Sequence, residues 1–197
     1  AVNTVPGLIG VILTMTMILF TAVAIVREKE RGNLELLITT PIRTPELMLA
    51  KLLPYIFIGL VQMSLVLIFG VLLFKVPIRG SLLDAYTVSL VFIVANLALG
   101  LMISTLAQTQ FQAMQMTFFI LLPSILLSGF MFPFAGMPVA AQWIAEVLPM
   151  THFMRLIRGV VLRGANLADL AGELLILGVF ITVAMTVAIK RFHKRLD

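Results

Sequence analysis

Cysteine is absent from this sequence of 197 residues, and charged side chains are scarce. Without cysteine the chain can form no disulfide bond and no thiolate metal site. Asp, Glu, Lys and Arg together make up only 12% of the residues, against about a quarter in soluble globular proteins. This shortage of charge excludes an ordinary soluble domain.

Apolar residues take the place of the missing charge. They make up 61% of the chain, and the mean hydropathy is +1.13. Residues 85–145 contain no charged side chain and are too long for one membrane crossing of roughly 20 residues, so we expect two spans there with a turn within Gln108–Gln115. No period-2 alternation supports a barrel. The sequence predicts an all-α integral membrane protein with five transmembrane helices, at about residues 5–26, 52–74, 85–107, 113–132 and 168–189.

Lys and Arg are unevenly divided between the two predicted sides of the membrane. One side holds nine of them and the other five, and the richer side is expected to be cytoplasmic. The N-terminus is then outside and the C-terminus inside. The opening residues have no signal peptide and no initiating Met, so we expect the numbered chain to follow at least one earlier span of a longer protein. The nine are Arg27, Lys29, Arg31, Arg43, Lys51, Lys190, Arg191, Lys194 and Arg195; the five are Lys75, Arg79, Arg155, Arg158 and Arg163.

Motifs for catalysis are missing as well. There is no G-x-S-x-G, no H-E-x-x-H and no Walker-type G-x-x-x-x-G-K-[ST]. The two histidines, His152 and His193, are expected on opposite sides of the membrane, and His152 has no ligand partner nearby. The net charge of +5 comes without a nucleic-acid-binding motif. We therefore predict no enzyme activity, no metal and no cofactor in this chain, and no nucleic-acid partner.

The segment Arg27–Lys51, REKERGNLELLITTPIRTPELMLAK, holds five of the chain's fourteen Lys and Arg residues and four of its nine Asp and Glu residues. Leu34 and Leu37 share one face of a helix, Asn33 can cap its start, and Pro41 ends it, which predicts a short amphipathic helix along the membrane surface. One interpretation is a solvated loop whose charges fix the topology. Glutamates contribute little to topology, however, so their presence favours a docking surface of complementary charge.

Three stretches together resemble one known family. REKERGNLELLITTP resembles the segment after the second membrane helix in permease subunits of type-2 ATP-binding-cassette exporters. PSILLSGFMFPFAGMP resembles that family's fifth helix with its break and re-entrant hairpin, and LPMTHFMRLIRGVVLRG resembles the stretch before its last span. Asn33 stands where the family usually has Thr. The first motif is matched by Glu28, Glu30, Gly32, Leu34, Glu35, Leu37, Thr40, Pro41, Ala50 and Lys51.

The resemblance implies a function and partners. Residues 1–197 would form one permease domain of the bacterial inner membrane, and segment 27–51 would couple it to a separate ATPase subunit that binds ATP and Mg. A second permease, identical or different, would complete a dimer among membrane lipids, and the complex would export an amphiphilic drug, lipid or polysaccharide. The implied coupling residues are Glu28, Glu30, Arg31, Gly32, Asn33, Leu34, Glu35, Leu37 and Pro41.

Four other polar residues are candidates for a role in transport. Gln62 and Asn96 lie near the centres of their spans, where they either line a pathway or hydrogen-bond neighbouring helices. Asp169 and Glu173 begin the last helix and predict a cap or an outer gate. Residues 133–166 are expected to form an outer re-entrant or interfacial segment, with arginines reaching lipid phosphates.

Two other functions compete with ATP-driven export. A membrane scaffold or receptor would recruit a soluble cytoplasmic partner through the same charged segment without transporting anything. A secondary carrier is disfavoured, because no charged residue lies at a span centre and no inverted repeat is visible.

Overall fold

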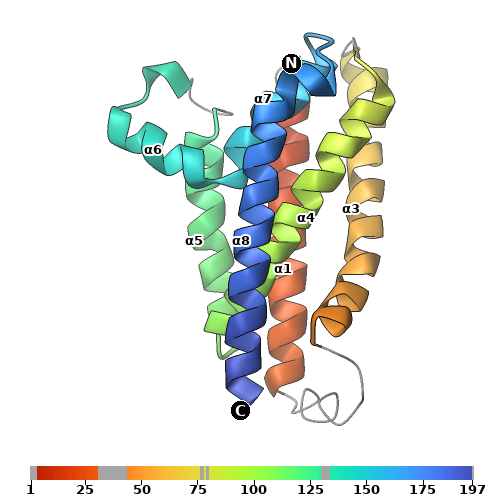
Figure 1. The fold of residues 1–197 in the computed structure, drawn as a ribbon. Coiled ribbons are helices and arrows are strands. Elements are labelled where there is room, and N and C mark those ends of the chain that lie inside the picture. The colour runs from red at the N-terminus through yellow and green to blue at the C-terminus, as the bar shows by residue number, and fades with distance from the viewer. Residues whose placement is uncertain (1–3, 31–43, 76–77, 79, 130–133, 197) are drawn as a thin grey trace.

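The structure is a computed structural model that describes residues 4–30, 44–75, 78, 80–129 and 134–196. Within these ranges every regular element is a helix (Figure 1). The shorter elements, α6 and α7, follow α5 and precede α8, and short 3-10 turns flank them at Phe134–Gly136 and Leu167–Leu170. The helices are α1 (Thr4–Glu30), α3 (Thr44–Phe74), α4 (Leu82–Leu106), α5 (Gln110–Leu127), α6 (Val139–Val147), α7 (Pro149–Val161) and α8 (Ala171–Leu196).

The five long helices each contain a stretch that is long and apolar enough to cross a membrane. Within the described residues the all-α prediction is therefore confirmed, and the number of candidate membrane spans agrees with the five predicted. Successive long helices run in opposite directions, so the end of α1, the start of α3 and the end of α8 lie at one end of the bundle (Figure 1). The opposite end holds the start of α1, and α7 lies in that half.

The turn between α4 and α5 is shorter than predicted. The sequence places the turn within Gln108–Gln115, but α5 already begins at Gln110. Thr109 is its N-cap: the Thr109 hydroxyl accepts a hydrogen bond of 3.1 Å from the backbone N–H of Gln112. Polar side chains thus form the first turn of a helix here and do not form the loop. The same helix ends at Leu127, earlier than the predicted limit of residue 132.

Helices α1 and α4 form the centre of the bundle. Of the α4 span 72% is buried, compared with 22% for α3 and 17% for α8, whose apolar side chains face outward. Because a lipid-facing helix loses nothing by exposing Leu, Ile and Phe, this is the arrangement expected in a bilayer. An aromatic contact in the core joins Phe92 of α4 to Phe153 of α7, whose stacked rings have centroids 4.0 Å apart.

The interfacial interpretation of the outer segment is wrong for α7. Its apolar side chains, among them Phe153, Ile157 and Val160, are fully buried against the core formed by α1 and α4. The exposed apolar residues of the segment belong to α6, where Trp143 and Val147 are uncovered. An amphipathic pattern requires an apolar neighbour for one face but does not specify whether lipid or other helices provide it, which explains the difference.

Close packing of α1 on α4 depends on Gly100. A Cβ atom at this position would lie 2.9 Å from Cβ of Thr21 and 3.0 Å from the carbonyl oxygen of Ile18. At Gly178 of α8, a Cβ would meet nothing within 4 Å. Both glycines are helical, so alanine improves helix propensity equally at the two positions.

We therefore expect Gly100→Ala to lower the free energy of unfolding by about 1–2 kcal/mol relative to Gly178→Ala. The measurement is the thermal unfolding midpoint of both variants in one detergent. Equal midpoints would contradict the proposed close contact of α1 and α4.

Candidate functional site

The predicted coupling segment begins where α1 ends and finishes where α3 begins. Its residues Arg31, Gly32, Asn33, Leu34, Glu35, Leu37 and Pro41 lie outside the described residues. Glu28, Glu30 and Lys51 are described: the two glutamates lie at the end of α1 and Lys51 lies near the start of α3, at the two ends of the segment. The end of α1 and the start of α3 lie at the end of the bundle where α8 also finishes (Figure 1).

Glu28 and Lys51 tie the end of α1 to the start of α3. The Lys51 ammonium forms an ion pair with the Glu28 carboxylate, and the two side chains are only 25% and 34% exposed. A partly buried pair is less screened by water and salt than a surface pair, so its loss has a larger effect. The two helices that frame the coupling segment are thereby joined at the point where the segment leaves them.

Glu30 joins the same end of α1 to α5. Its carboxylate accepts a hydrogen bond of 3.0 Å from the backbone N–H of Gln110 and another of 2.8 Å from the Gln110 side-chain amide. Gln110 is the first residue of α5, where a negative charge also interacts favourably with the helix dipole. Arg27 donates a longer hydrogen bond, 3.5 Å, to the Gln110 side-chain oxygen. The carboxylates of Glu28 and Glu30 thus contact other helices of this chain.

The two candidate pathway residues lie within helix contacts. Gln62 of α3 accepts a hydrogen bond of 2.8 Å from the Thr16 hydroxyl of α1. Asn96 of α4 is 1% exposed, and its amide nitrogen has no hydrogen-bond partner among the described residues. Gln62 therefore has the environment of a packing residue, whereas Asn96 is a buried polar group whose amide nitrogen remains unsatisfied.

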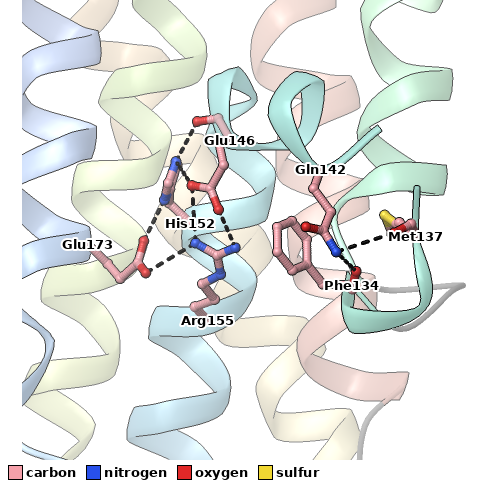
Figure 2. A network of polar contacts seen from close by, with 7 residues as sticks. All are labelled: Phe134, Met137, Gln142, Glu146, His152, Arg155 and Glu173. Carbon is pink, nitrogen blue, oxygen red and sulfur yellow. Dashed lines mark hydrogen bonds and ion pairs between the residues drawn. The ribbon is translucent and has the colours of Figure 1, made fainter. Parts of the chain in front are cut away.

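A polar network in the half of the bundle opposite the coupling segment, predicted to be the outer half, joins α6, α7 and α8 (Figure 2). Arg155 donates to Glu146 at 2.7 Å and to Glu173 at 3.2 Å, and its guanidinium lies 4.6 Å from the centre of the Phe134 ring. His152 is 1% exposed; its Nδ1 contacts the Glu173 carboxylate, and its Nε2 lies 2.7 Å from the Glu146 carbonyl oxygen.

Both partners of His152 are acceptors. The ring satisfies both only as the doubly protonated imidazolium, or when Glu173 carries the proton. Gln142 completes the arrangement by donating to the Phe134 carbonyl oxygen at 3.0 Å, which holds the turn Phe134–Gly136 against α6. We call Glu146, His152, Arg155 and Glu173 the outer network.

The sequence did not reveal the outer network. From the sequence, His152 was considered only as a metal ligand, and its hydrogen-bond partners were not anticipated: Glu146 comes from six residues before it and Glu173 from the next membrane helix. Only the shared outer location of Glu146 and Glu173 pointed to a contact. Asp169 and Glu173, expected on one face, have different partners, because Asp169 accepts from the backbone N–H of Asn166 in a capping box.

We expect the outer network to make the free energy of unfolding depend on pH in the acid range. The hydrogen bond and the charge of Arg155 lower the pKa of Glu146 below its ordinary value of about 4.5, while partial burial opposes the shift. A carboxyl with a lowered folded-state pKa stabilises the fold above its ordinary pKa and loses this contribution as the pH falls through the lowered value.

We therefore expect Glu146→Gln to be less stable than the original chain at pH 7, by up to about 1 kcal/mol because the group is solvent-screened. The difference should shrink as the pH falls below about 4.5 and vanish once the pH lies below the lowered pKa of Glu146. Unfolding midpoints measured across this range test it, and a difference that does not vary with pH would contradict it.

The sequence is similar to a known protein family and to several known proteins. Residues 1–162 match the family described as ABC-2 type transporter. The chain is 37% identical over 161 residues to the probable multidrug ABC transporter permease YbhS of Escherichia coli strain K12, covering 81% of this chain and 43% of that protein.

Two further relatives from the same organism are also similar. The probable multidrug ABC transporter permease YbhR is 32% identical over 163 residues, which cover 83% of this chain and 44% of YbhR. The inner membrane transport permease YhhJ is 32% identical over 185 residues, which cover 92% of this chain and 49% of YhhJ. The chain thus spans less than half of the length of each of these relatives.

Proposed function

This chain belongs to the ABC-2 type transporter family, as a permease, and from that premise we propose that it couples ATP hydrolysis by a separate ATPase subunit to export across the inner membrane. Its 197 residues act as one permease domain. ATP and Mg are bound by the partner subunit. A second permease chain, identical or different, completes the dimer, with the export route between the two.

The observation that carries this proposal is the joining of three helices at the end of α1. Glu28 binds Lys51 of α3, and Glu30 binds Gln110 of α5. A force on the segment between α1 and α3 therefore acts on three membrane helices as connected bodies, which is what coupling to a moving soluble partner requires.

The proposed orientation places this end of the bundle in the cytoplasm. Arg27, Lys51 and the basic end of α8 then share the cytoplasmic side, in agreement with the excess of Lys and Arg there. The outer network and the start of α1 face the outside. In this orientation the coupling residues from Glu28 to Pro41 are within reach of an ATPase subunit.

Three further residues are given roles in the proposed mechanism. Asn96, with its unsatisfied amide, is the better candidate for a pathway residue that becomes accessible when the helices move. Glu173 acts in an outer gate through its contacts with His152 and Arg155. Asp169 caps the turn before α8.

The proposed substrate is an amphiphile of the drug, lipid or polysaccharide class. Two relatives are described as probable multidrug permeases, and this favours the drug class. The apolar bundle, with no charged side chain in residues 85–145, suits a substrate that enters from the membrane.

The test is ATP-dependent uptake into inside-out vesicles that contain the full-length permease and its ATPase subunit. Fluorescent lipophilic drugs and a fluorescent phospholipid serve as probes. We expect uptake of at least one probe, and none with an ATPase subunit whose Walker lysine is replaced. Assembly and ATP hydrolysis without uptake of any probe would contradict export of an amphiphile.

A further inference from the structure

A cavity of about 500 Å³ lies between the end of α5, the turn Phe134–Gly136 and α7. Three of its lining residues are arginines, Arg155, Arg158 and Arg163. Its size falls in the range of about 300–1,000 Å³ typical of small-molecule sites. We call it the arginine cavity.

Two of the three arginines bring uncompensated positive charge to the cavity. Arg155 is neutralised by Glu146 and Glu173 in the outer network. Arg158 and Arg163, in contrast, form no ion pair with any carboxylate of the described residues; Arg158 donates only to the Gly129 carbonyl oxygen, at 3.2 Å. Burial lowers the pKa of the Arg158 guanidinium, as expected for a cation without an anionic partner.

Two buried polar atoms of cavity-lining residues have no hydrogen-bond partner among the described residues. The Ser128 hydroxyl is buried, with the residue 3% exposed, and makes no hydrogen bond within the part of the chain that the structure describes. The Nε–H of Arg158 is likewise buried and unsatisfied. Buried polar groups normally have partners, because leaving one without a partner costs roughly 1–3 kcal/mol. Both atoms are donors suited to an oxyanion, and both belong to residues that line the cavity.

Apolar side chains line the rest of the cavity: Phe134, Ala135, Met154 and Leu162. A free inorganic anion would gain nothing from these residues, whereas a hydrocarbon chain would.

We propose that the arginine cavity binds the anionic headgroup of an amphiphile. Phosphate or carboxylate oxygens contact Arg158, Arg163 and the Ser128 hydroxyl, and the start of the hydrocarbon chain lies against Phe134 and Leu162. Planar guanidinium groups bind phosphate and carboxylate oxygens in pairs, which gives geometric selectivity as well as charge. The site requires no transport step and so goes beyond the proposed function.

The experiment measures lipid retained by the full-length permease. The protein is purified with its ATPase subunit from nanodiscs that contain equal phosphatidylglycerol and phosphatidylcholine, and native mass spectrometry counts the retained molecules of each. We expect preferential retention of phosphatidylglycerol, falling about tenfold in Arg158→Gln/Arg163→Gln. Ser128→Ala should reduce it to a smaller extent, and Arg158→Lys/Arg163→Lys should keep part of it. Lys190→Gln removes one exposed charge elsewhere and should change nothing.

Competition distinguishes the sources of the anion. Displacement of phosphatidylglycerol by oleate would extend the site to carboxylate amphiphiles, and resistance to oleate would restrict it to phosphodiesters. Displacement of phosphatidylglycerol by inorganic phosphate at equal concentration would overturn the proposal that the ligand is an amphiphile. Equal retention by the original protein and the double variant would overturn the site. If the double variant does not fold, Arg163→Gln alone decides, because Arg163 is exposed and its loss should still lower retention.

Discussion

Glu28→Lys is expected to lower the ATP-driven activity of the assembled transporter about tenfold while the protein remains in the membrane. The substitution replaces the partly buried ion pair between Glu28 and Lys51 with two like charges at the junction of α1 and α3. Breaking such a pair costs on the order of 1–3 kcal/mol, which lowers the population of the arrangement in which α1 and α3 are joined. A cost of about 1.4 kcal/mol lowers that population, and with it the activity, by a factor of ten. The measurement is ATP-dependent transport by the reconstituted complex, with membrane content determined in parallel.

Exchanging the two charges distinguishes a joint between helices from a docking charge. Glu28→Lys/Lys51→Glu restores the attraction between α1 and α3, so activity should return to at least half of the original. If Glu28 instead acted by contacting the ATPase subunit, the double exchange would stay as inactive as Glu28→Lys. Lys190→Glu, a charge reversal at the exposed end of α8, is the control and should have little effect.

Arg155→Ala is expected to be the most destabilising substitution of the outer network, lowering the free energy of unfolding by about 2–3 kcal/mol. Arg155 bridges Glu146 and Glu173 and covers the Phe134 ring. Its removal leaves two carboxylates close together beside the buried His152 ring. The thermal unfolding midpoint of the purified protein measures the loss.

Two further variants make this result specific. Arg155→Lys keeps the charge but cannot bridge both carboxylates with the same geometry, so its midpoint should lie between those of the original and Arg155→Ala. Arg191→Ala removes an exposed arginine and should leave the midpoint unchanged within about 0.5 kcal/mol. A loss in Arg155→Ala no larger than that in Arg191→Ala would contradict a stabilising outer network.

The spans could be predicted because the bilayer imposes a simple requirement. A charge-free run of about 20 residues has few alternatives to a membrane helix, and residues 85–107 accordingly fall almost entirely within α4. Limits set by single hydrogen bonds, such as the Thr109 cap that starts α5, are weaker signals in a sequence. The burial of α7 against the protein core was not predictable, because the same amphipathic pattern suits lipid and protein neighbours.

The candidate sites were predictable only where partners are close in sequence. Glu28 and Glu30 were identified by their motif, but their partners Lys51 and Gln110 come from other helices. His152 meets Glu173 only because α7 packs against the start of α8. Contacts of this kind depend on how helices pack, and a single sequence does not specify that.

The central claim is that the segment between α1 and α3 contacts the ATPase subunit, and site-directed crosslinking tests it most directly. Because this chain has no native cysteine, Leu34→Cys and Trp143→Cys each introduce a unique thiol into it. With a thiol-reactive crosslinker and ATP, Leu34→Cys should crosslink to the ATPase subunit, and Trp143→Cys, in α6 near the outer network, should not. The claim would be contradicted if Leu34→Cys gave no crosslink and were labelled by an impermeant thiol reagent from outside the membrane.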